Sequence, residues 1–325
     1  MADMTPPAGA ADFLARHGWA GAAVTPLAGD ASFRRYFRVT EPARSAVLMD
    51  APPPHEDPQP FLDVARWLTA KGFAAPAIHA ADLQAGLVLL EDFGDARLRE
   101  AIDADPAAAC DLYAPAIDLL VELARHPAGA AAPYDMAVLL REAALFVEWY
   151  CPAVGLEVDA EGWEAAWRDV LHHALTPEPV TVLRDFHAEN LMLVGEDRRL
   201  GLLDFQDALA GHPAYDLVSL LQDARRDVDP SVEEAMLARY RAATGAGEAF
   251  MRAYHVLGCQ RNAKIVGIFT RLWKRDGKPR YPGLCPRVWA YLERGLSQPV
   301  LGPVAAWFDA NVPPEKRGDP LLLSR

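Results

Sequence analysis

Three oxygen-bearing side chains stand where the sequence pattern predicts that they come together. Asp185 and Asn190 belong to the segment RDFHAEN, and Asp204 follows in the segment LLDFQD. Between Asn190 and Asp204 the chain reads LMLV, GEDRR and GLLDF. An apolar run, a turn and a second apolar run predict a β-hairpin. A hairpin brings the residue before its first strand close to the residue after its second strand. We therefore expect Asn190 and Asp204 to converge on one point, with Asp185 nearby.

An amide oxygen beside a carboxylate is a set of hard oxygen ligands. Mg²⁺ prefers such ligands and takes the rest of its coordination from phosphates and water. Asn190 and Asp204 are therefore the candidate metal ligands, and Asp185 is a carboxylate that the metal does not require. A carboxylate in this position can orient an attacking hydroxyl group or accept its proton. Asp185 is accordingly the candidate catalytic residue.

The order of these residues is the order found in phosphoryl transfer on a kinase-like scaffold. The catalytic-loop pattern H-R-D-x-x-x-x-N stands here as LRDFHAEN, with Leu183 in place of the histidine, and the metal-binding D-F-G stands as DFQ. The D-x-x-x-x-N spacing is common by chance, and two solvated loops are the plain alternative. Its combination with DF at this distance, after a sheet-rich segment, favours the kinase-like interpretation.

The elements around these residues fall into two groups. Strand-like runs occur at 24–39 and 45–50 and in PAIHAAD and GLVLLED, and an amphipathic helix is predicted at 61–72. After residue 96 the periodicity is mostly helical. We therefore predict an α+β, two-lobed, protein-kinase-like fold. Its N-lobe, residues 1–95, would be a nucleotide-covering sheet with a hinge at its end. Its C-lobe, residues 96–325, would be mainly helical and hold the catalytic loop, the metal site and the sugar site.

Two N-lobe segments are candidates for nucleotide contacts. The turn GDASF, which contains Ser32, stands between two strands where a kinase places its phosphate-covering loop. It is poorer in glycine than that loop usually is, so an ordinary hairpin turn is the alternative. The segment LEDFG would join the lobes, and the backbone from Glu91 to Phe93 could hydrogen-bond an adenine edge. The alternative for this segment is a buried strand that ends in an exposed turn, which the same residues would also fit.

The third strand lacks the lysine that kinases use to hold ATP phosphates. SAVLMD places Met49 at that position. The preceding strand, FRRYFR, offers arginines, and its alternation puts Arg34, Tyr36 and Arg38 on one face. If Tyr36 covers the nucleotide, Arg34 points toward the phosphates, which a guanidinium can bind in a bidentate manner. A plain surface strand is the alternative for these arginines.

Several motifs together resemble the anomeric sugar kinases of bacterial cell-wall recycling, within the aminoglycoside phosphotransferase-like superfamily. The resemblance runs from about residue 10 to the C-terminus, and its motifs are SFRRYF, VLMDAPP, LVLLEDFGD, LRDFHAENLM, LLDFQDA, GHPAYDLVSLLQDAR and QRNAKIVGIFTRL. It implies a phosphotransferase that uses ATP and Mg²⁺ to phosphorylate the C1 hydroxyl of N-acetylmuramate and N-acetylglucosamine in peptidoglycan recycling. Met49 in place of lysine is similar to that branch. The resemblance also implies that Asp216 is a structural aspartate that braces the catalytic loop.

A basic segment near the C-terminus suggests where an anionic acceptor would bind. Residues 261–287 hold eight Arg or Lys against one acid, Asp276, in a chain of net charge −13. One helical face could gather Arg261, Lys264 and Arg271, to which Arg275 adds a further charge. This face would suit the lactyl carboxylate of muramate, and a basic surface helix paired to acidic neighbours is the alternative. His187 and Glu189 are candidates either for contacts with the acceptor sugar or for shaping their loop. Asp207 is a candidate either for binding sugar hydroxyls or for a plain surface position.

Composition narrows the class of protein. The 325 residues are 51% hydrophobic, which is ordinary for a globular protein, and the net charge of −13 argues against a nucleic-acid binder. No apolar run reaches the roughly 18 residues that span a membrane, and the N-terminus lacks the pattern of a secretory signal. We expect a cytoplasmic monomer whose partners are an amino sugar and ATP, with neither nucleic acid nor membrane as a partner.

Two alternatives stay open for the activity. One is another small-molecule kinase of the aminoglycoside, choline or homoserine kinase type. The basic segment argues against an aminoglycoside, which is itself cationic. The other is a nucleotide-binding pseudokinase, which Leu183 and Met49 would permit. The presence of Asp185, Asn190 and Asp204 together argues against a scaffold without chemistry.

Overall fold

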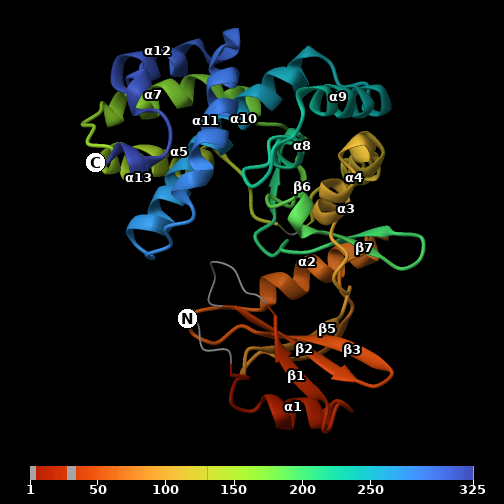
Figure 1. Cartoon of the computed structure of the whole chain (residues 1–325). Helices are drawn as coiled ribbons and strands as arrows, with labels where there is room; N and C mark the ends of the chain where they lie inside the picture. The colour runs from red at the N-terminus through yellow and green to blue at the C-terminus, as the bar shows by residue number, and fades with distance from the viewer. Residues whose placement is uncertain (1–4, 28–33, 130, 325) are drawn as a thin grey trace. The chain divides into compact units, whose positions relative to one another are not determined.

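The computed structural model describes residues 5–27, 34–129 and 131–324, which form two compact units (Figure 1). The first unit consists of Met1–Ala104 together with Glu189–Asp207, and the second of Asp105–Ala188 together with Ala208–Arg325. The first carries the large sheet and the second is mainly helical, so the predicted α+β class is confirmed. The expected division into an N-lobe, 1–95, and a C-lobe, 96–325, stays a prediction. By packing, the segment Glu189–Asp207 belongs to the first unit.

The first unit is built on a five-stranded antiparallel sheet in the order β1-β2-β3-β5-β4. Alternation along β2 turns Phe37 and Val39 toward α1, where Phe13 and Leu14 join them in an apolar core. Tyr36 and its cross-strand partner Met49 lie on the opposite face. The elements are α1 (Ala10–Arg16), β1 (Ala23–Pro26), β2 (Arg35–Glu41), β3 (Arg44–Asp50), α2 (Gln59–Ala70), β4 (Ile78–Asp82), β5 (Leu87–Glu91) and α3 (Leu98–Ala104).

The predicted hairpin forms and packs within this first unit. Its strands are β7 (Leu191–Val194) and β8 (Arg199–Leu202), paired so that Leu191 faces Leu202. The Leu202 amide donates to the Ala74 carbonyl at 2.8 Å. Phe205, just after the hairpin, stacks on Phe61 of α2 with ring centroids 5.0 Å apart. These contacts explain why a segment from the middle of the chain belongs to the sheet-bearing unit.

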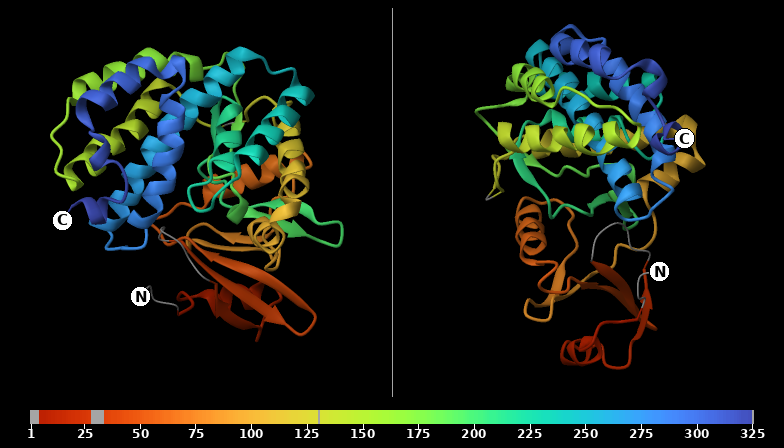
Figure 2. Two further views of the ribbon diagram at one scale, coloured as in Figure 1. Left: turned by 45° about the horizontal axis from the view of Figure 1, so that its top comes forward. Right: turned by 90° about the vertical axis from the view of Figure 1, so that its left-hand side faces the viewer.

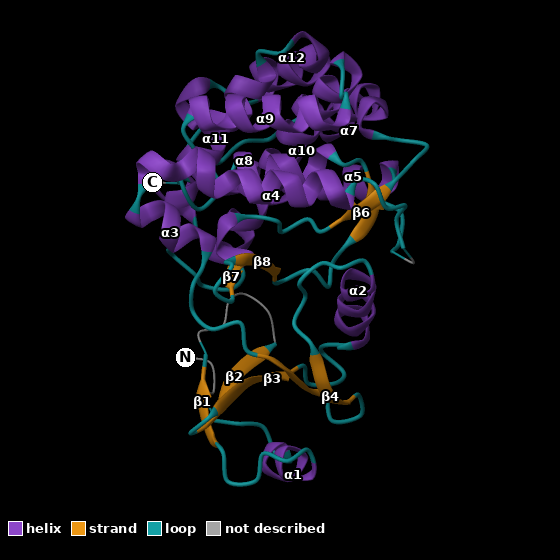
Figure 3. Cartoon of the chain, turned by 90° about the vertical axis from the view of Figure 1, so that its right-hand side faces the viewer, coloured by secondary structure: helices purple, strands orange, loops and turns teal. Residues whose placement is uncertain are grey.

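The second unit is a helical assembly around the long helix α10, which packs against α5, α8 and α11 (Figures 1 and 2). Helix is its dominant structure in Figure 3, where β6 appears as a short orange strand. Its elements are α4 (Ala109–Leu123), α5 (Met136–Leu145), a π-helical turn (Phe146–Tyr150), α6 (Cys151–Ala153), α7 (Ala160–Leu171), β6 (Val180–Val182), β9 (Leu209–Gly211), α8 (Ala214–Leu221), α9 (Pro230–Thr244), α10 (Glu248–Lys274), α11 (Cys285–Leu296), α12 (Gly302–Asn311) and α13 (Pro320–Leu323). Short 3₁₀ turns occur at Pro106–Ala108, His172–Ala174, Ala188–Asn190, Pro282–Leu284, Pro299–Leu301 and Pro314–Lys316.

An aromatic cluster fastens α7, α11 and α12 to the π-helical turn. The ring of Phe146 stacks on Trp163 of α7 at 5.2 Å and meets Trp289 of α11 and Phe308 of α12 edge-on. Within the part of the chain that the structure describes, no helix is both long and apolar enough to cross a membrane.

Gly267 marks the point where α10 passes closest to the end of α5. A Cβ atom at this position would lie 2.3 Å from the Leu145 carbonyl oxygen, and backbone cannot move aside as a flexible side chain can. We predict that Gly267→Ala lowers the free energy of unfolding by about 1–3 kcal/mol through overpacking. Gly302→Ala is the matched control, because a Cβ there meets nothing within 4 Å. Urea denaturation of both variants measures the difference, and equal stability of the two would contradict the close approach.

Candidate functional site

The turn that carries Asp185 follows β6 in the second unit and is held by Asp216. Arg184 adopts a φ of 70°, in the left-handed region that residues other than glycine rarely occupy. Asp216 of α8 is 2% exposed, and its two carboxylate oxygens accept the amides of Leu183 and Arg184 at 2.7 and 2.8 Å. These are the contacts that the expected bracing role would use, and they fix the backbone immediately before Asp185.

Asp185 is partly accessible and surrounded by cationic side chains. Burial opposes its charge, but His187, Lys264 and Arg261 outweigh burial and hold the pKa of the carboxyl below its usual value. Burial lowers the pKa of His187 itself to about 3, so this imidazole is neutral at pH 7. The lasting positive charges near Asp185 are therefore Lys264, Arg261 and Arg184. Asp185 is consequently a carboxylate at neutral pH, which a hydroxyl-orienting or proton-accepting group must be.

Glu142 of α5 holds two of these cations. Its carboxylate forms ion pairs with Arg184 and with Lys264, whose Nζ atom lies 2.9 Å away, and it accepts a hydrogen bond from the Tyr134 hydroxyl. Although burial acts in the opposite direction, Lys264 and Arg184 lower the pKa of Glu142. Lys264 also lies 3.3 Å from the Tyr215 hydroxyl oxygen. The two cations are thus fixed by an acid that was not among the predicted site residues.

The predicted basic face of α10 does not form one surface. Arg261 is 3% exposed and donates from Nη2 to the Ser219 hydroxyl at 2.8 Å. Lys264 is already paired, and Arg275 pairs with Asp276 at 2.6 Å. Arg271 is partly exposed, and burial together with Arg275 lowers its pKa. The four side chains therefore lie in different environments. Their expected contacts with the sugar stay predictions.

The other predicted sugar-contacting residues differ in exposure. His187 is 3% exposed, and its Nε2 atom accepts from Arg225 at 3.1 Å. Glu189 forms an ion pair with Arg99 of α3, in the first unit. Asp207 is exposed on the turn after the hairpin. His187 and Glu189 therefore have partners that shape their own loops, while their contact with a sugar stays a prediction.

The hairpin of the first unit brings the two predicted metal ligands together. The Asn190 Nδ2 atom lies 3.3 Å from Asp204 Oδ2, and the Leu203 amide donates to the Asn190 carbonyl at 3.0 Å. Asp204 is exposed, with a φ of 57° and its Oδ1 accepting from Gln206 at 2.9 Å. Among the described residues there is no group of three or more His, Cys, Asp or Glu that could hold a metal. One carboxylate with one amide fits Mg²⁺, which completes its shell with phosphate and water.

Around Tyr36, the arginines of the FRRYFR segment have different partners. Arg35 pairs with Asp50 at 2.6 Å, and Arg38 pairs with Asp92 and Asp95 at 2.9 Å. Arg34 lies within hydrogen-bonding reach of Tyr36 and 3.5 Å from Glu56. Burial raises the pKa of Tyr36 to about 12, with Arg34 lowering it and Asp204 raising it. Arg34 and the predicted metal ligand Asp204 thus both act electrostatically on Tyr36.

Other predicted nucleotide contacts fall at the sheet and hinge. Met49 is fully buried beside Tyr36. The Glu91 amide donates to the Ala77 carbonyl at 2.8 Å, and the expected backbone contact of Glu91 to Phe93 with an adenine stays a prediction. Phe93 packs against Gly201, where a Cβ atom would lie 2.6 Å from its ring. Ser32 lies outside the described residues.

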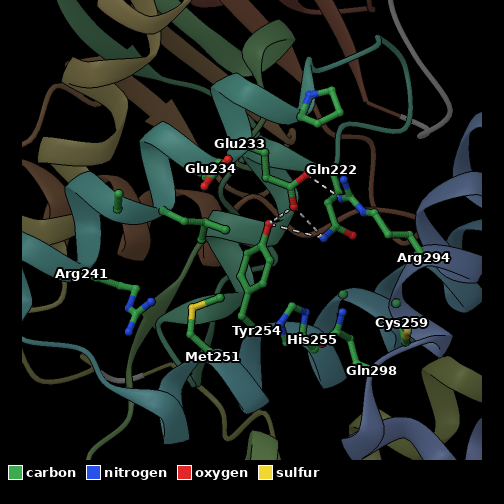
Figure 4. Close-up of a pocket in the computed structure, with 15 residues that line it drawn as sticks. Gln222, Glu233, Glu234, Arg241, Met251, Tyr254, His255, Cys259, Arg294 and Gln298 are labelled. Atoms are coloured by element: carbon green, nitrogen blue, oxygen red, sulfur yellow. Dashed lines mark hydrogen bonds and ion pairs between the residues drawn. The ribbon is translucent and has the colours of Figure 1, made fainter.

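Sequence reasoning missed two residues that organise this site. Ser219 follows Asp216 by three positions in AYDLVSLL, which puts both on one face of a helix. That spacing could have indicated that Ser219 faces the same turn as Asp216. Glu142 follows Arg141 in the mainly apolar helix MAVLLREAAL, and an acid buried in such a helix implies a cationic partner. A cavity of about 390 Å³ also lies in the second unit (Figure 4). It is lined by Gln222, Glu233, Tyr254, Arg294 and others, but by none of the predicted site residues.

Comparison with known proteins gives consistent results. A family model described as the phosphotransferase enzyme family matches residues 23–254. A curated relative from Caulobacter vibrioides is 38% identical over 94% of this chain and 97% of its own length, and is named N-acetylmuramate/N-acetylglucosamine kinase. Relatives of the same name from Pseudomonas aeruginosa and Neisseria meningitidis are 41% and 37% identical, covering 85% and 83% of this chain and 85% of each relative.

Solved structures share the fold. A choline/ethanolamine kinase family protein from Mesorhizobium loti aligns with a TM-score of 0.64 at 14% identity, covering 92% of this chain and 95% of that one. The gentamicin complex of APH(2")-IIa aligns with a TM-score of 0.62 at 16% identity, covering 91% and 98%. At such identities the likeness concerns the fold alone, and it confirms the predicted kinase-like architecture.

The low pKa of His187 makes stability depend on pH. The unfolded chain binds a proton to this imidazole near pH 6.5, whereas the folded protein does so only near pH 3, so stability falls as the pH drops through that window. We predict that His187→Gln flattens this loss between about pH 7 and pH 5, by up to roughly 1.4 kcal/mol per pH unit. Urea denaturation at both pH values measures it, with the exposed His79→Gln as control. An unchanged slope in His187→Gln would show that the imidazole is not buried in its neutral form.

Proposed function

This chain belongs to the phosphotransferase enzyme family, and from that premise we propose that it is an ATP-dependent anomeric sugar kinase. It transfers phosphate to the C1 hydroxyl of N-acetylmuramate and N-acetylglucosamine in peptidoglycan recycling. The carrying observation is Asp185, an ionised carboxylate on a braced turn, five positions before an asparagine whose amide meets Asp204. The acceptor sugar comes from the relatives' names, since they align over most of both chains.

In this proposal Asp185 orients the sugar hydroxyl and accepts its proton as the bond to phosphorus forms. The lowered pKa keeps the carboxylate charged before the reaction, and general-base catalysis contributes typically 10²- to 10⁴-fold. Asn190 and Asp204 would hold Mg²⁺, which supplies charge neutralisation at the phosphate oxygens. Asp216 acts through the backbone of the turn and contacts neither substrate.

The nucleotide would bind to the sheet-bearing unit. We assign Arg34 to the phosphates, because it lies beside Tyr36, the residue expected to cover the nucleotide. Met49 offers an apolar side chain where kinases place lysine, so the guanidinium of Arg34 supplies the cation instead. Further nucleotide contacts are proposed for Ser32 in the turn and for the backbone at Glu91 and Phe93.

The acceptor would bind to cationic and polar groups around Asp185. We propose that Lys264 and Arg271 attract the lactyl carboxylate of muramate, and that His187, Glu189 and Asp207 shape the sugar site or contact its hydroxyls. Without an acceptor, Glu142 balances the positive charge of Lys264. The protein would work in the cytoplasm as a monomer.

Replacing the two aspartates separates catalysis from metal binding. Asp185→Asn should leave folding and nucleotide binding nearly unchanged and lower turnover about 10²- to 10⁴-fold, because the proton acceptor is lost. Asp204→Ala should instead abolish Mg²⁺-dependent nucleotide binding. ADP release with each sugar and calorimetric titration of nucleotide measure the two effects. Wild-type turnover in Asp185→Asn would show that this turn is not a catalytic loop.

Removing Arg34 tests the cation that stands in for lysine. Arg34→Ala should raise the KM for ATP and slow transfer, because a guanidinium at the phosphates is lost. The matched control is Arg66→Ala, which removes an exposed arginine of α2. Steady-state kinetics against ATP measure both variants. If Arg34→Ala behaves like the wild type while Arg38→Ala fails, the assignment of Arg34 to the phosphates is wrong.

A further inference from the structure

We propose that Arg261 and Ser219 are positioning residues that hold the carbonyl of Arg184 and thereby aim Asp185, and that Arg261 does not contact the sugar. This inference rests on the proposed function for its kinetic readout. It gives Arg261 a role different from the one expected from the basic face of α10. The hydrogen bonds that carry this role all lie within the second unit.

A short chain of hydrogen bonds links α10 to the catalytic turn. The Ser219 hydroxyl of α8 is fully buried and donates to the Arg184 carbonyl at 2.9 Å. A hydroxyl has one proton to donate and can accept in return. Arg261 Nη2 donates to that same oxygen at 2.8 Å. Arg261 therefore occupies the acceptor side of the hydroxyl and leaves its proton directed at the carbonyl.

The carbonyl that Ser219 holds belongs to the peptide between Arg184 and Asp185. The amide of Arg184 is held by Asp216, which lies three positions before Ser219 on the same face of α8. One helix thus grips both polar groups of a residue whose φ of 70° is unfavourable without such support. Fixing this peptide plane fixes the direction in which the Asp185 side chain leaves the backbone.

The environment of Arg261 suits an internal role. Its side chain is 3% exposed, so little of it can reach a ligand, and a buried guanidinium requires acidic neighbours. Burial raises the pKa of Asp185 and of Asp216, and the charge of Arg261 opposes that rise in both acids. The adjacent Asn262 donates to Gln222 Oε1 at 2.8 Å, so a second buried contact keeps α8 and α10 in register. Gln222 is also among the residues that line the cavity in Figure 4.

Four variants test the proposal. Ser219→Ala removes only the hydroxyl, and Arg261→Met removes the charge. Arg261→Lys keeps a cationic donor. Arg294→Met is the control, because it removes a guanidinium that pairs with a buried acid, Glu233, far along the chain from the turn. Each is assayed for ADP release with N-acetylmuramate and with N-acetylglucosamine, for thermal unfolding, and for amide hydrogen exchange of residues 183–187.

Positioning predicts a loss of kcat with little change in KM. We expect about a tenfold lower kcat in Ser219→Ala and about a hundredfold lower kcat in Arg261→Met, equally for both sugars, because misplacing a reacting group by about 1 Å costs on this order. Arg261→Lys should recover part of the loss. Exchange of the turn amides should quicken in Ser219→Ala and Arg261→Met. Arg294→Met should lose stability but keep kcat within about twofold and leave turn exchange unchanged.

Two results would overturn the proposal. A KM for N-acetylmuramate that rises selectively in Arg261→Met, with kcat retained, would show that Arg261 binds the sugar carboxylate. Unchanged turn exchange in Ser219→Ala would show that the hydroxyl does not hold the loop. Exchange needs no substrate and Ser219→Ala removes no charge. The positioning role is therefore decided even if Arg261→Met fails to fold, or if the wild type phosphorylates neither sugar and the proposed function falls.

Discussion

A buried carboxylate hydrogen-bonded to two successive backbone amides is the constraint on which the rest of the site depends. Asp216 can lie inside the helical unit only because Leu183 and Arg184 donate to it, since an unsatisfied buried charge is strongly unfavourable. Burial raises its pKa to about 7, while those two amides and Arg261 act in the opposite direction. Removing any of these partners would favour the protonated acid and release the turn. The geometry of Asp185 therefore depends on how completely Asp216 is satisfied.

Acidic and basic side chains alternate around the turn that carries Asp185. Glu142 fixes Arg184 and Lys264, and these two cations together with Arg261 keep Asp185 ionised. Because each cation has an acid or a hydroxyl as partner, a cluster of buried charges stays balanced. The carboxylate that we propose as proton acceptor is thus held charged by neighbours to which the proposal gives no reacting role. This division between a reacting group and its supports is typical of preorganised active sites.

Local patterns predicted much of this architecture, and distant contacts supplied the rest. The hairpin between Asn190 and Asp204 follows from apolar runs that flank a turn, so its pairing could be read from the sequence. The ion pairs of Arg35 and Arg38 could not be predicted from the sequence, because their partners Asp50 and Asp92 come from other segments of the chain. Likewise, helical spacing groups Arg261 with the other basic residues of α10. In the structure Arg261 is buried against α8 and is separated from them. Spacing alone cannot show which side of a helix another helix will cover.

The central claim is transfer of phosphate to the anomeric hydroxyl, and the most direct measurement compares two acceptors. N-acetylglucosamine and its methyl glycoside share every hydroxyl except the one at C1. With ATP and Mg²⁺, the free sugar should release ADP and yield a sugar 1-phosphate, visible by phosphorus NMR, while the methyl glycoside should give no ADP above background. Equal rates for the two would place the transfer on another hydroxyl and contradict the proposed activity.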